Sequence, residues 1–127
     1  MGMALMASGM RQHRLGDQVR KVISEIIQRK LRNPQLGMVT ITDVELTKDL
    51  RQAKVFYSVY GDETVRQSSA KALRQSTGFI QSELSRSIRI RKVPVLEFIF
   101  DESVERGLRI QELLAKIERE EGGETNG

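Results

Sequence analysis

The sequence predicts an α+β domain in which a three-stranded mixed sheet carries its helices on one face. Three observations support this fold class. One amphipathic helix comes first, and two segments with period-two apolar alternation follow it, separated by a short polar turn. A connection of more than thirty residues with helical periodicity then leads to a third alternating segment, which allows a parallel crossover. The length of 127 residues fits one compact domain.

The first helix has the clearest pattern in the chain. Asp17 is its candidate N-cap, and Asn33 with Pro34 is expected to end it, because proline breaks the helical hydrogen-bond pattern and restricts the residue before it. Residues 1–10 are expected to be a disordered leader or vector-derived residues outside the fold. The apolar stripe of this helix, with spacings of three and four, consists of Val19, Val22, Ile23, Ile26, Ile27 and Leu31.

The next segment predicts a strand with one irregularity. Residues 39–42 alternate cleanly, and the apolar phase then moves to Val44 and Leu46, so we expect a β-bulge near Asp43. Residues 47–49, which read Thr-Lys-Asp, are expected to form the turn of a hairpin.

Two further strands complete the predicted sheet. Residues 53–60 carry bulky side chains on both faces, as expected of a central strand. Residues 95–101 alternate, with Leu96, Phe98 and Phe100 on one face. The long connection lets this third strand lie parallel to the second, so the strand at 53–60 is expected in the centre of the sheet.

Helices are predicted in the long connection and at the C-terminal end. Asp62 is the candidate N-cap of the helical region before Pro94, and Ser103 is the candidate N-cap of a final helix. The domain is expected to span residues 11–117, and residues 118–127 are expected to form an acidic flexible tail. The expected inward residues are Val65, Ala72, Leu73, Ile80, Leu84 and Ile88 in the first region and Leu108, Ile110, Leu113, Leu114 and Ile117 in the final helix.

The composition offers little chemistry for catalysis. There is no cysteine, which excludes disulfides, thiolate zinc sites and cysteine nucleophiles, and His13 is the only histidine. Two carboxylate pairs, Asp43 with Glu45 and Asp101 with Glu102, are expected to be solvated rather than paired for acid and base work. No glycine-rich phosphate loop and no membrane-spanning window occurs. We therefore expect no catalytic residue, metal, cofactor or small-molecule substrate, and a cytoplasmic location.

The charge is divided along the chain. From Arg11 to Lys92 there are 17 Lys or Arg against 8 Asp or Glu, a net +9, whereas 4 against 9 from Val93 onward give −5. A basic body with an acidic end favours a polyanionic partner, because cations aligned on one surface release counterions from phosphates. On charge alone, the alternative of a solvated arginine-rich surface stays open.

A glycine lies in the middle of the helical region from Ala72 to Pro94. Gly78 follows Ser76 and Thr77, whose hydroxyls compete for backbone groups, so a kink is predicted at this triplet. A second helix that starts afresh at the kink would expose backbone N–H groups to a phosphate. The alternative is that Gly78 is a packing residue beside a neighbouring element.

Basic residues are the best candidates for a binding site. Aromatic residues are few and mostly placed in strands, which favours recognition of backbone and shape over bases that stack on rings. Cations near a helix C-terminus also complement the macrodipole, a structural use that covers Arg89 and Arg91. The main predicted phosphate contacts are Arg74, Arg86, Arg89, Arg91 and Lys92, and the secondary ones are Arg20, Arg29 and Arg32.

A resemblance to the ribosome-binding factor A family covers about Arg11 to Ile117. Three segments carry it: VTITDVELTKDLRQAKVFYSVYG, ALRQSTGFIQSELSRSIRIRKVPVLEFIFDES and VERGLRIQELL. The resemblance implies a single type II KH-like domain with the order α-β-β-α-kink-α-β plus a C-terminal helix. In this family a kink on an Ala-x-Gly triplet replaces the GxxG loop. Here the triplet is Ser76, Thr77 and Gly78, with serine where the family usually has alanine.

The same resemblance implies a function. It is that of a bacterial cytoplasmic assembly factor without catalytic activity, which binds the small (30S) ribosomal subunit and its rRNA during late maturation. Processing of the rRNA 5′ end and growth in the cold are implied as well, and the free protein is expected to be monomeric. The residues alone indicate only a basic, noncatalytic binder of a structured polyanion. Two other classes stay open: a protein interaction module that docks through its sheet edge or C-terminal helix, and a small enzyme.

Overall fold

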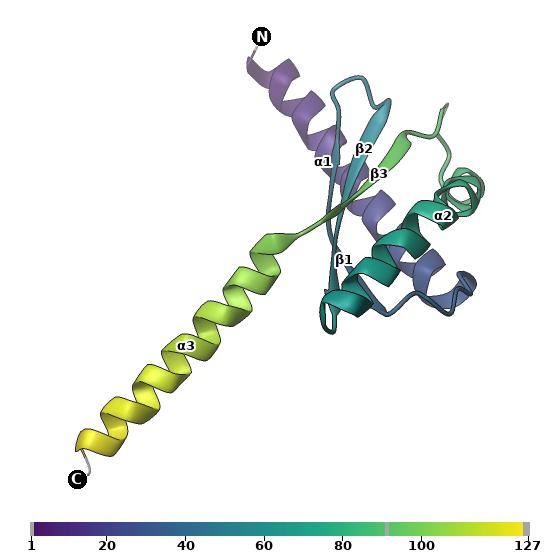
Figure 1. Ribbon diagram of the computed structural model, residues 1–127. Coiled ribbons are helices and arrows are strands. Elements are labelled where there is room, and N and C mark those ends of the chain that lie inside the picture. The colour runs from purple at the N-terminus through teal and green to yellow at the C-terminus, as the bar shows by residue number, and fades with distance from the viewer. Residues whose placement is uncertain (1, 91, 126–127) are drawn as a thin grey trace.

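A computed structural model describes residues 2–90 and 92–125, with side chains for 10–90, 92–103 and 110–120. Two helices lie on one face of a three-stranded sheet, and a third helix extends away from this body (Figure 1). None of the described helices has the length and apolar content that a bilayer span needs. The elements in order are α1 (Gly2–Glu25), the π-helix η1 (Ile26–Lys30), β1 (Met38–Leu46), β2 (Gln52–Tyr60), α2 (Glu63–Ser87), β3 (Val95–Phe100) and α3 (Glu102–Thr125).

The sheet has the order β1-β2-β3 and is mixed, as predicted. β1 pairs antiparallel with β2, and β2 pairs parallel with β3. The register shifts between Ile41 and Asp43, which confirms the bulge expected near Asp43. The bulged residue, Thr42, donates its hydroxyl to Asp101 Oδ2 at 2.7 Å, so the bulge ties β1 to the segment where β3 ends.

The hairpin turn extends beyond the predicted range of 47–49, because β2 begins only at Gln52. Leu50 has a positive φ of 60° and donates its N–H to the Thr47 carbonyl at 2.9 Å. The carboxylate of Asp49 accepts the Thr47 hydroxyl at 2.6 Å and the Arg51 N–H at 3.1 Å. The Thr47 hydrogen bond and the Arg51 backbone hydrogen bond lower the pKa of Asp49. The turn is therefore held by side-chain contacts on its own residues.

One apolar core joins the sheet to α1 and α2. Side chains from the two helices, including Ile23, Leu73 and Leu84, are fully buried against the inward residues of the strands. On the other face of the sheet, Lys54 and Glu97 are exposed. The prediction of helices on one face is therefore confirmed for α1 and α2, and burial of their apolar faces stabilises the arrangement.

The boundaries of the first helix differ from the prediction. α1 begins at Gly2 and passes through Asp17, so Asp17 as N-cap is wrong. No proline lies before Asp17, so the helix can extend toward the N-terminus. The helical segment ends in a π-turn, where the Leu31 N–H donates to the Ile26 carbonyl at 2.9 Å, before Asn33 and Pro34 are reached. The role of residues 1–10 as a leader stays a prediction.

The final helix is capped differently than predicted, and it does not join the core. Asp101 Oδ1 accepts the Ser103 N–H at 3.0 Å, so Asp101, and not Ser103, caps the start of α3.

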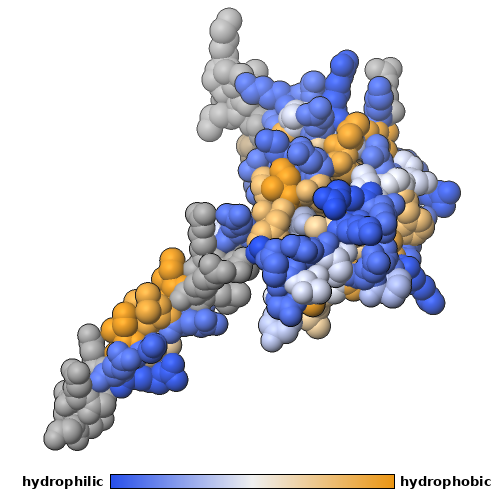
Figure 2. Space-filling view, viewed as in Figure 1, coloured by the Kyte–Doolittle hydropathy of each residue, from blue (hydrophilic) through white to orange (hydrophobic). Residues whose placement is uncertain are grey.

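An apolar stripe on α3 faces solvent (Figure 2), because the helix leaves the sheet at the end of β3. The Leu108 side chain lies outside the described residues. α3 continues to Thr125, and the flexibility of residues 118–127 stays a prediction. The exposed stripe consists of Ile110, Leu113, Leu114 and Ile117.

Candidate nucleic-acid interface

The helix α2 has a buried face and an exposed face. Asp62 Oδ1 accepts the Val65 N–H at 3.0 Å, which confirms Asp62 as N-cap. The predicted inward residues Ala72, Leu73, Ile80 and Leu84 are buried, and Val65 is half-buried. The opposite side, which we call the outer face of α2, is exposed and consists of Lys71, Arg74, Gln75, Gly78, Phe79, Ser82, Ser85 and Arg86. This face is polar and cationic, with one aromatic ring.

The helix bends without a break. α2 is a single element from Glu63 to Ser87, so the expectation that a second helix starts afresh near Gly78 and exposes free N–H groups is wrong. Figure 1 shows that α2 nevertheless changes direction, since its first part lies across the view and its last part is seen nearly end-on. The Thr77 hydroxyl donates to the Leu73 carbonyl at 2.9 Å, a contact that favours helix bending. That the bend is centred on Ser76, Thr77 and Gly78 stays a prediction.

Gly78 does not pack against another element. Among the described residues, no atom outside the local helix lies within 4 Å of the position that a Cβ would occupy at Gly78. The interpretation of Gly78 as a packing residue is therefore wrong. The bare backbone at this position faces open space on the outer face of α2.

Replacing Gly78 with alanine is expected to raise the free energy of unfolding by about 0.5–1 kcal/mol. The added methyl group meets nothing, and alanine loses less conformational entropy than glycine when the helix forms. Urea denaturation followed by circular dichroism measures the change. A loss of stability would show that the bend of α2 needs the backbone freedom of glycine at this position.

The main predicted phosphate contacts do not all lie on the helix. α2 ends at Ser87, because Ile88 takes an extended backbone conformation (φ −122°, ψ 131°) and turns into the core. Arg89 and Lys92 are therefore exposed in the connection to β3, and the interpretation of Arg89 as a cation of the last helical turn is wrong. Arg91 lies outside the described residues. In the last turn of α2 the basic residue is Arg86.

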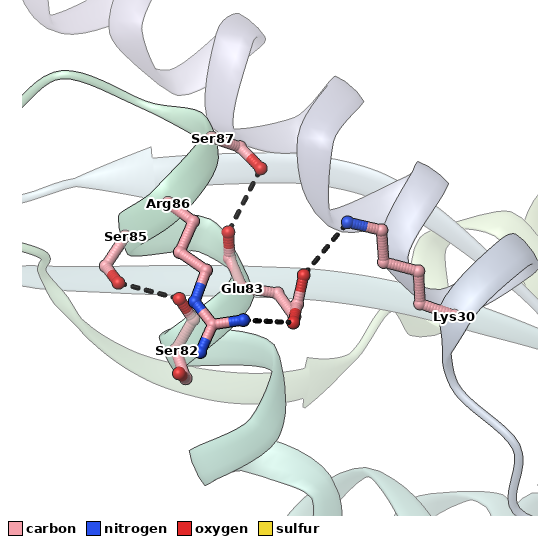
Figure 3. A network of polar contacts seen from close by, with 6 residues as sticks. All are labelled: Lys30, Ser82, Glu83, Ser85, Arg86 and Ser87. Atoms are coloured by element: carbon pink, nitrogen blue, oxygen red, sulfur yellow. Dashed lines mark hydrogen bonds and ion pairs between the residues drawn. The ribbon is translucent and has the colours of Figure 1, made fainter.

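Glu83 links the two helical segments and holds Arg86. Its carboxylate contacts Lys30 Nζ of η1 at 2.9 Å and the Arg86 guanidinium at 3.3 Å (Figure 3). The Lys30 hydrogen bond, with smaller charge contributions from Lys30 and Arg86, lowers the pKa of Glu83. The Arg86 side chain is still 73% exposed. Glu83 thus offsets part of the charge of Arg86 and orients the guanidinium, while most of the N–H donors of Arg86 face solvent.

The secondary contacts lie along the first helical segment. Arg20 is half-buried on α1, whereas Arg29 in η1 and Arg32 after it are exposed. Because Lys30 between them reaches Glu83, this part of the chain lies beside the C-terminal part of α2. Arg29 and Arg32 therefore belong to the segment that lies beside the C-terminal part of α2, while Arg20 lies further back along α1.

Arg66 on the first half of α2 has a structural role. Its guanidinium lies 4.6 Å from the centroid of the Phe100 ring, and it also forms an ion pair with Glu63. Phe100 meets Tyr57 edge to face at 5.8 Å between centroids, and burial raises the pKa of Tyr57. Arg66 therefore faces the end of β3. The cations that the outer face of α2 exposes before Gly78 are Lys71 and Arg74.

Asp43 and Asp101, one carboxylate from each of the two pairs in the sequence, have structural contacts. Asp43 Oδ1 accepts the Val44 N–H at 2.9 Å, and Asp101 is held by Ser103 and Thr42, whose hydrogen bonds lower its pKa. Among the residues whose side chains the structure describes, no group of three or more His, Cys, Asp or Glu could hold a metal ion.

Comparisons with known proteins agree on one family. The model of the family "Ribosome-binding factor A" matches residues 11–114. The ribosome-binding factor A of Natranaerobius thermophilus is 46% identical over 110 residues, which cover 87% of this chain and 84% of the relative. The crystal structure of ribosome-binding factor A from Thermus thermophilus aligns with a TM-score of 0.63 at 28% identity, over 70% of this chain and 93% of that one. A homology model of Thermus thermophilus RbfA has been fitted into the cryo-EM map of a 30S–RbfA complex. It aligns with a TM-score of 0.61 at 27% identity, over 72% of this chain and 96% of that one.

Proposed function

Because the chain belongs to the ribosome-binding factor A family, a family of ribosome-binding factors without enzymatic activity, we propose that it binds the small ribosomal subunit through the outer face of α2. The observation that carries this proposal is the exposed, cationic side of a helix whose other side is locked in the core. The similarity to a protein fitted into a 30S complex supports the choice of partner. The ligand on this surface is the phosphate backbone of small-subunit rRNA.

The proposal extends to the cellular role that the family resemblance implies. The protein acts in the cytoplasm as a monomer when free, binds the subunit during late maturation, and supports processing of the rRNA 5′ end and growth in the cold. The predicted site residues keep their assigned roles: Arg74, Arg86, Arg89, Arg91 and Lys92 as main phosphate contacts, Arg20, Arg29 and Arg32 as secondary contacts, and Ser76, Thr77 and Gly78 as the bend that shapes the backbone approach. The concentration of positive charge between Arg11 and Lys92 supports binding by counterion release.

The triple variant Arg74→Gln, Arg89→Gln, Lys92→Gln is expected to bind small subunits more weakly and with a flatter salt dependence. The slope of log K against log salt should fall by roughly 0.7 to 0.9 for each lost phosphate contact. Arg86 is left in place, since its removal would also take away one of the two cations that contact the Glu83 carboxylate. Filter binding of purified 30S subunits over a salt series measures the slope.

A matched control removes the same charge elsewhere. The variant Lys54→Gln, Lys116→Gln, Arg119→Gln changes three exposed cations on β2 and α3, whereas Arg51 is kept because it lines the same pocket as Lys92. It should keep the parent slope. An equal loss in both triple variants would assign the salt dependence to net charge alone and reject Arg74, Arg89 and Lys92 as phosphate contacts.

The exposed stripe of α3 favours a second candidate function, protein docking. Ile110, Leu113 and Leu114 are each more than half exposed and lie at helical spacing on one side of α3. In this second candidate, α3 binds a protein partner and the arginines only keep the protein soluble. Ribonuclease digestion of the complex with the subunit separates the two candidates, because a protein contact survives the digestion and an rRNA contact does not.

A further inference from the structure

The ring of Phe79 is exposed on the same helix face as the predicted phosphate contacts. Of the six aromatic residues in the chain, Phe79 is the one that lies in a helix, and its side chain is 44% exposed. Phe79 is therefore the exception to the expectation that most rings lie in strands. An aromatic ring half out of water in the middle of a 25-residue helix offers a flat apolar surface to a ligand.

The surroundings of Phe79 show which kind of ligand fits. Its exposed neighbours one turn before and after on the helix are Gln75 and Ser82, and Gly78 beside it meets nothing. A protein-binding surface gathers several apolar side chains, as the stripe on α3 does. A single ring among polar and small residues lacks such a patch. The surroundings favour a nucleobase, which needs one flat apolar face and polar groups at its edge.

The cation Arg86 lies on nearly the same side of α2 as the Phe79 ring, and a contact with Glu83 orients it. Arg86 follows Phe79 by two helical turns on nearly the same side of α2, since seven residues make almost two full turns. The contact with Glu83 at 3.3 Å orients the Arg86 guanidinium, and the side chain remains 73% exposed. A strand of RNA that runs along α2 thus meets a stacking surface first and a phosphate contact about two turns further on.

We propose that Phe79 stacks on an unpaired base of the RNA that the outer face of α2 binds. Gly78 leaves the room for the sugar and phosphate of that nucleotide to approach the helix, and Gln75 lies where its amide can bond the edge of the base. This inference rests on the proposed function and deepens it. The surface recognises a single-stranded segment next to its phosphate contacts, in addition to a duplex backbone.

The test compares Phe79→Leu with Phe79→Trp in binding to purified 30S subunits. Leucine keeps the apolar character but removes the ring, so binding should weaken by about 5- to 150-fold, the range for loss of one stacked base. The slope of log K against log salt should stay that of the parent, because no phosphate contact is lost. Tryptophan should keep the affinity. Since the chain contains no other tryptophan, its fluorescence reports on the ring directly and should be quenched on binding.

Tyr60→Leu is the matched control, since Tyr60 is an even more exposed ring, at the end of β2 and away from α2's outer face. It should bind as the parent does. Parent-like binding of Phe79→Leu would overturn the inference while the triple cation variant still tests the proposed function separately. A loss with intact subunits that is absent with deproteinised small-subunit rRNA would assign Phe79 to a ribosomal protein contact, and would also overturn it.

Discussion

Replacing Leu84 with alanine is expected to lower the free energy of unfolding by about 2–5 kcal/mol. Leu84 is completely buried in the core that joins α2 to α1 and the sheet. Truncation removes apolar contacts and leaves a cavity that the tightly packed surroundings fill only in part. Urea denaturation at pH 7, followed by circular dichroism, measures the loss.

Leu113→Ala is the matched control for this prediction, because Leu113 is also a helical leucine but is 57% exposed on α3. Its replacement should change stability by no more than about 0.5 kcal/mol. Comparable losses in the two variants would mean that the α3 stripe packs against the body of the protein in solution, contrary to the arrangement in Figure 1.

Gly61→Ala is expected to cost about 1–3 kcal/mol of stability, the usual range for a strained backbone conformation. Gly61 joins β2 to α2 with a φ of 140°, which residues with a side chain rarely adopt. An added methyl group would also lie 2.9 Å from Val65 Cβ. Thermal or urea unfolding of the purified variant measures the cost.

The same substitution at Gly78 should have the opposite sign, so the two variants form a pair. Gly61 is needed for its backbone conformation, whereas Gly78 lies in a regular helix with open space beside it. Equal stability changes in Gly61→Ala and Gly78→Ala would contradict this distinction. If Gly78→Ala gains stability and binds small subunits like the parent, the bare backbone has no part in the interface.

Much of the fold could be predicted because it depends on local pattern. The phase change of apolar residues around Asp43 predicted the bulge, and the position of Asp62 before the helical pattern predicted its capping hydrogen bond. The length of the α2 connection predicted the parallel pairing of β3. In each case, the residues that determine the feature lie close together in the sequence or limit the topology directly.

Features that depend on distant contacts could not be predicted in this way. The capping of α3 by Asp101 also involves Thr42 on β1, and helical spacing on α3 predicts an apolar stripe without saying whether anything covers it. The end of α2 at Ser87 follows from the burial of Ile88 in the core, which outweighed the helical signal that continues toward Pro94.

The candidate site was only partly predictable for the same reason. The exposure of Arg74 follows from its place opposite Leu73 and Ile80 on a helix. The contact between Lys30 and Glu83 joins residues that are 53 positions apart, and no sequence signal marks it. Phe79 could have been noticed, since helical spacing places it at the edge of the buried stripe, beside Gly78.

The parallel pairing of β2 with β3 also determines the order in which the protein can fold. The hairpin of β1 and β2 can close early, because its turn is short, whereas β3 pairs only after the whole of α2 has been made and has crossed the sheet. During synthesis, β2 therefore keeps an open edge until the chain up to Phe100 has left the ribosome. The parallel edge of β2 is therefore the last edge of the sheet to be paired, after the hairpin and α2 have been made.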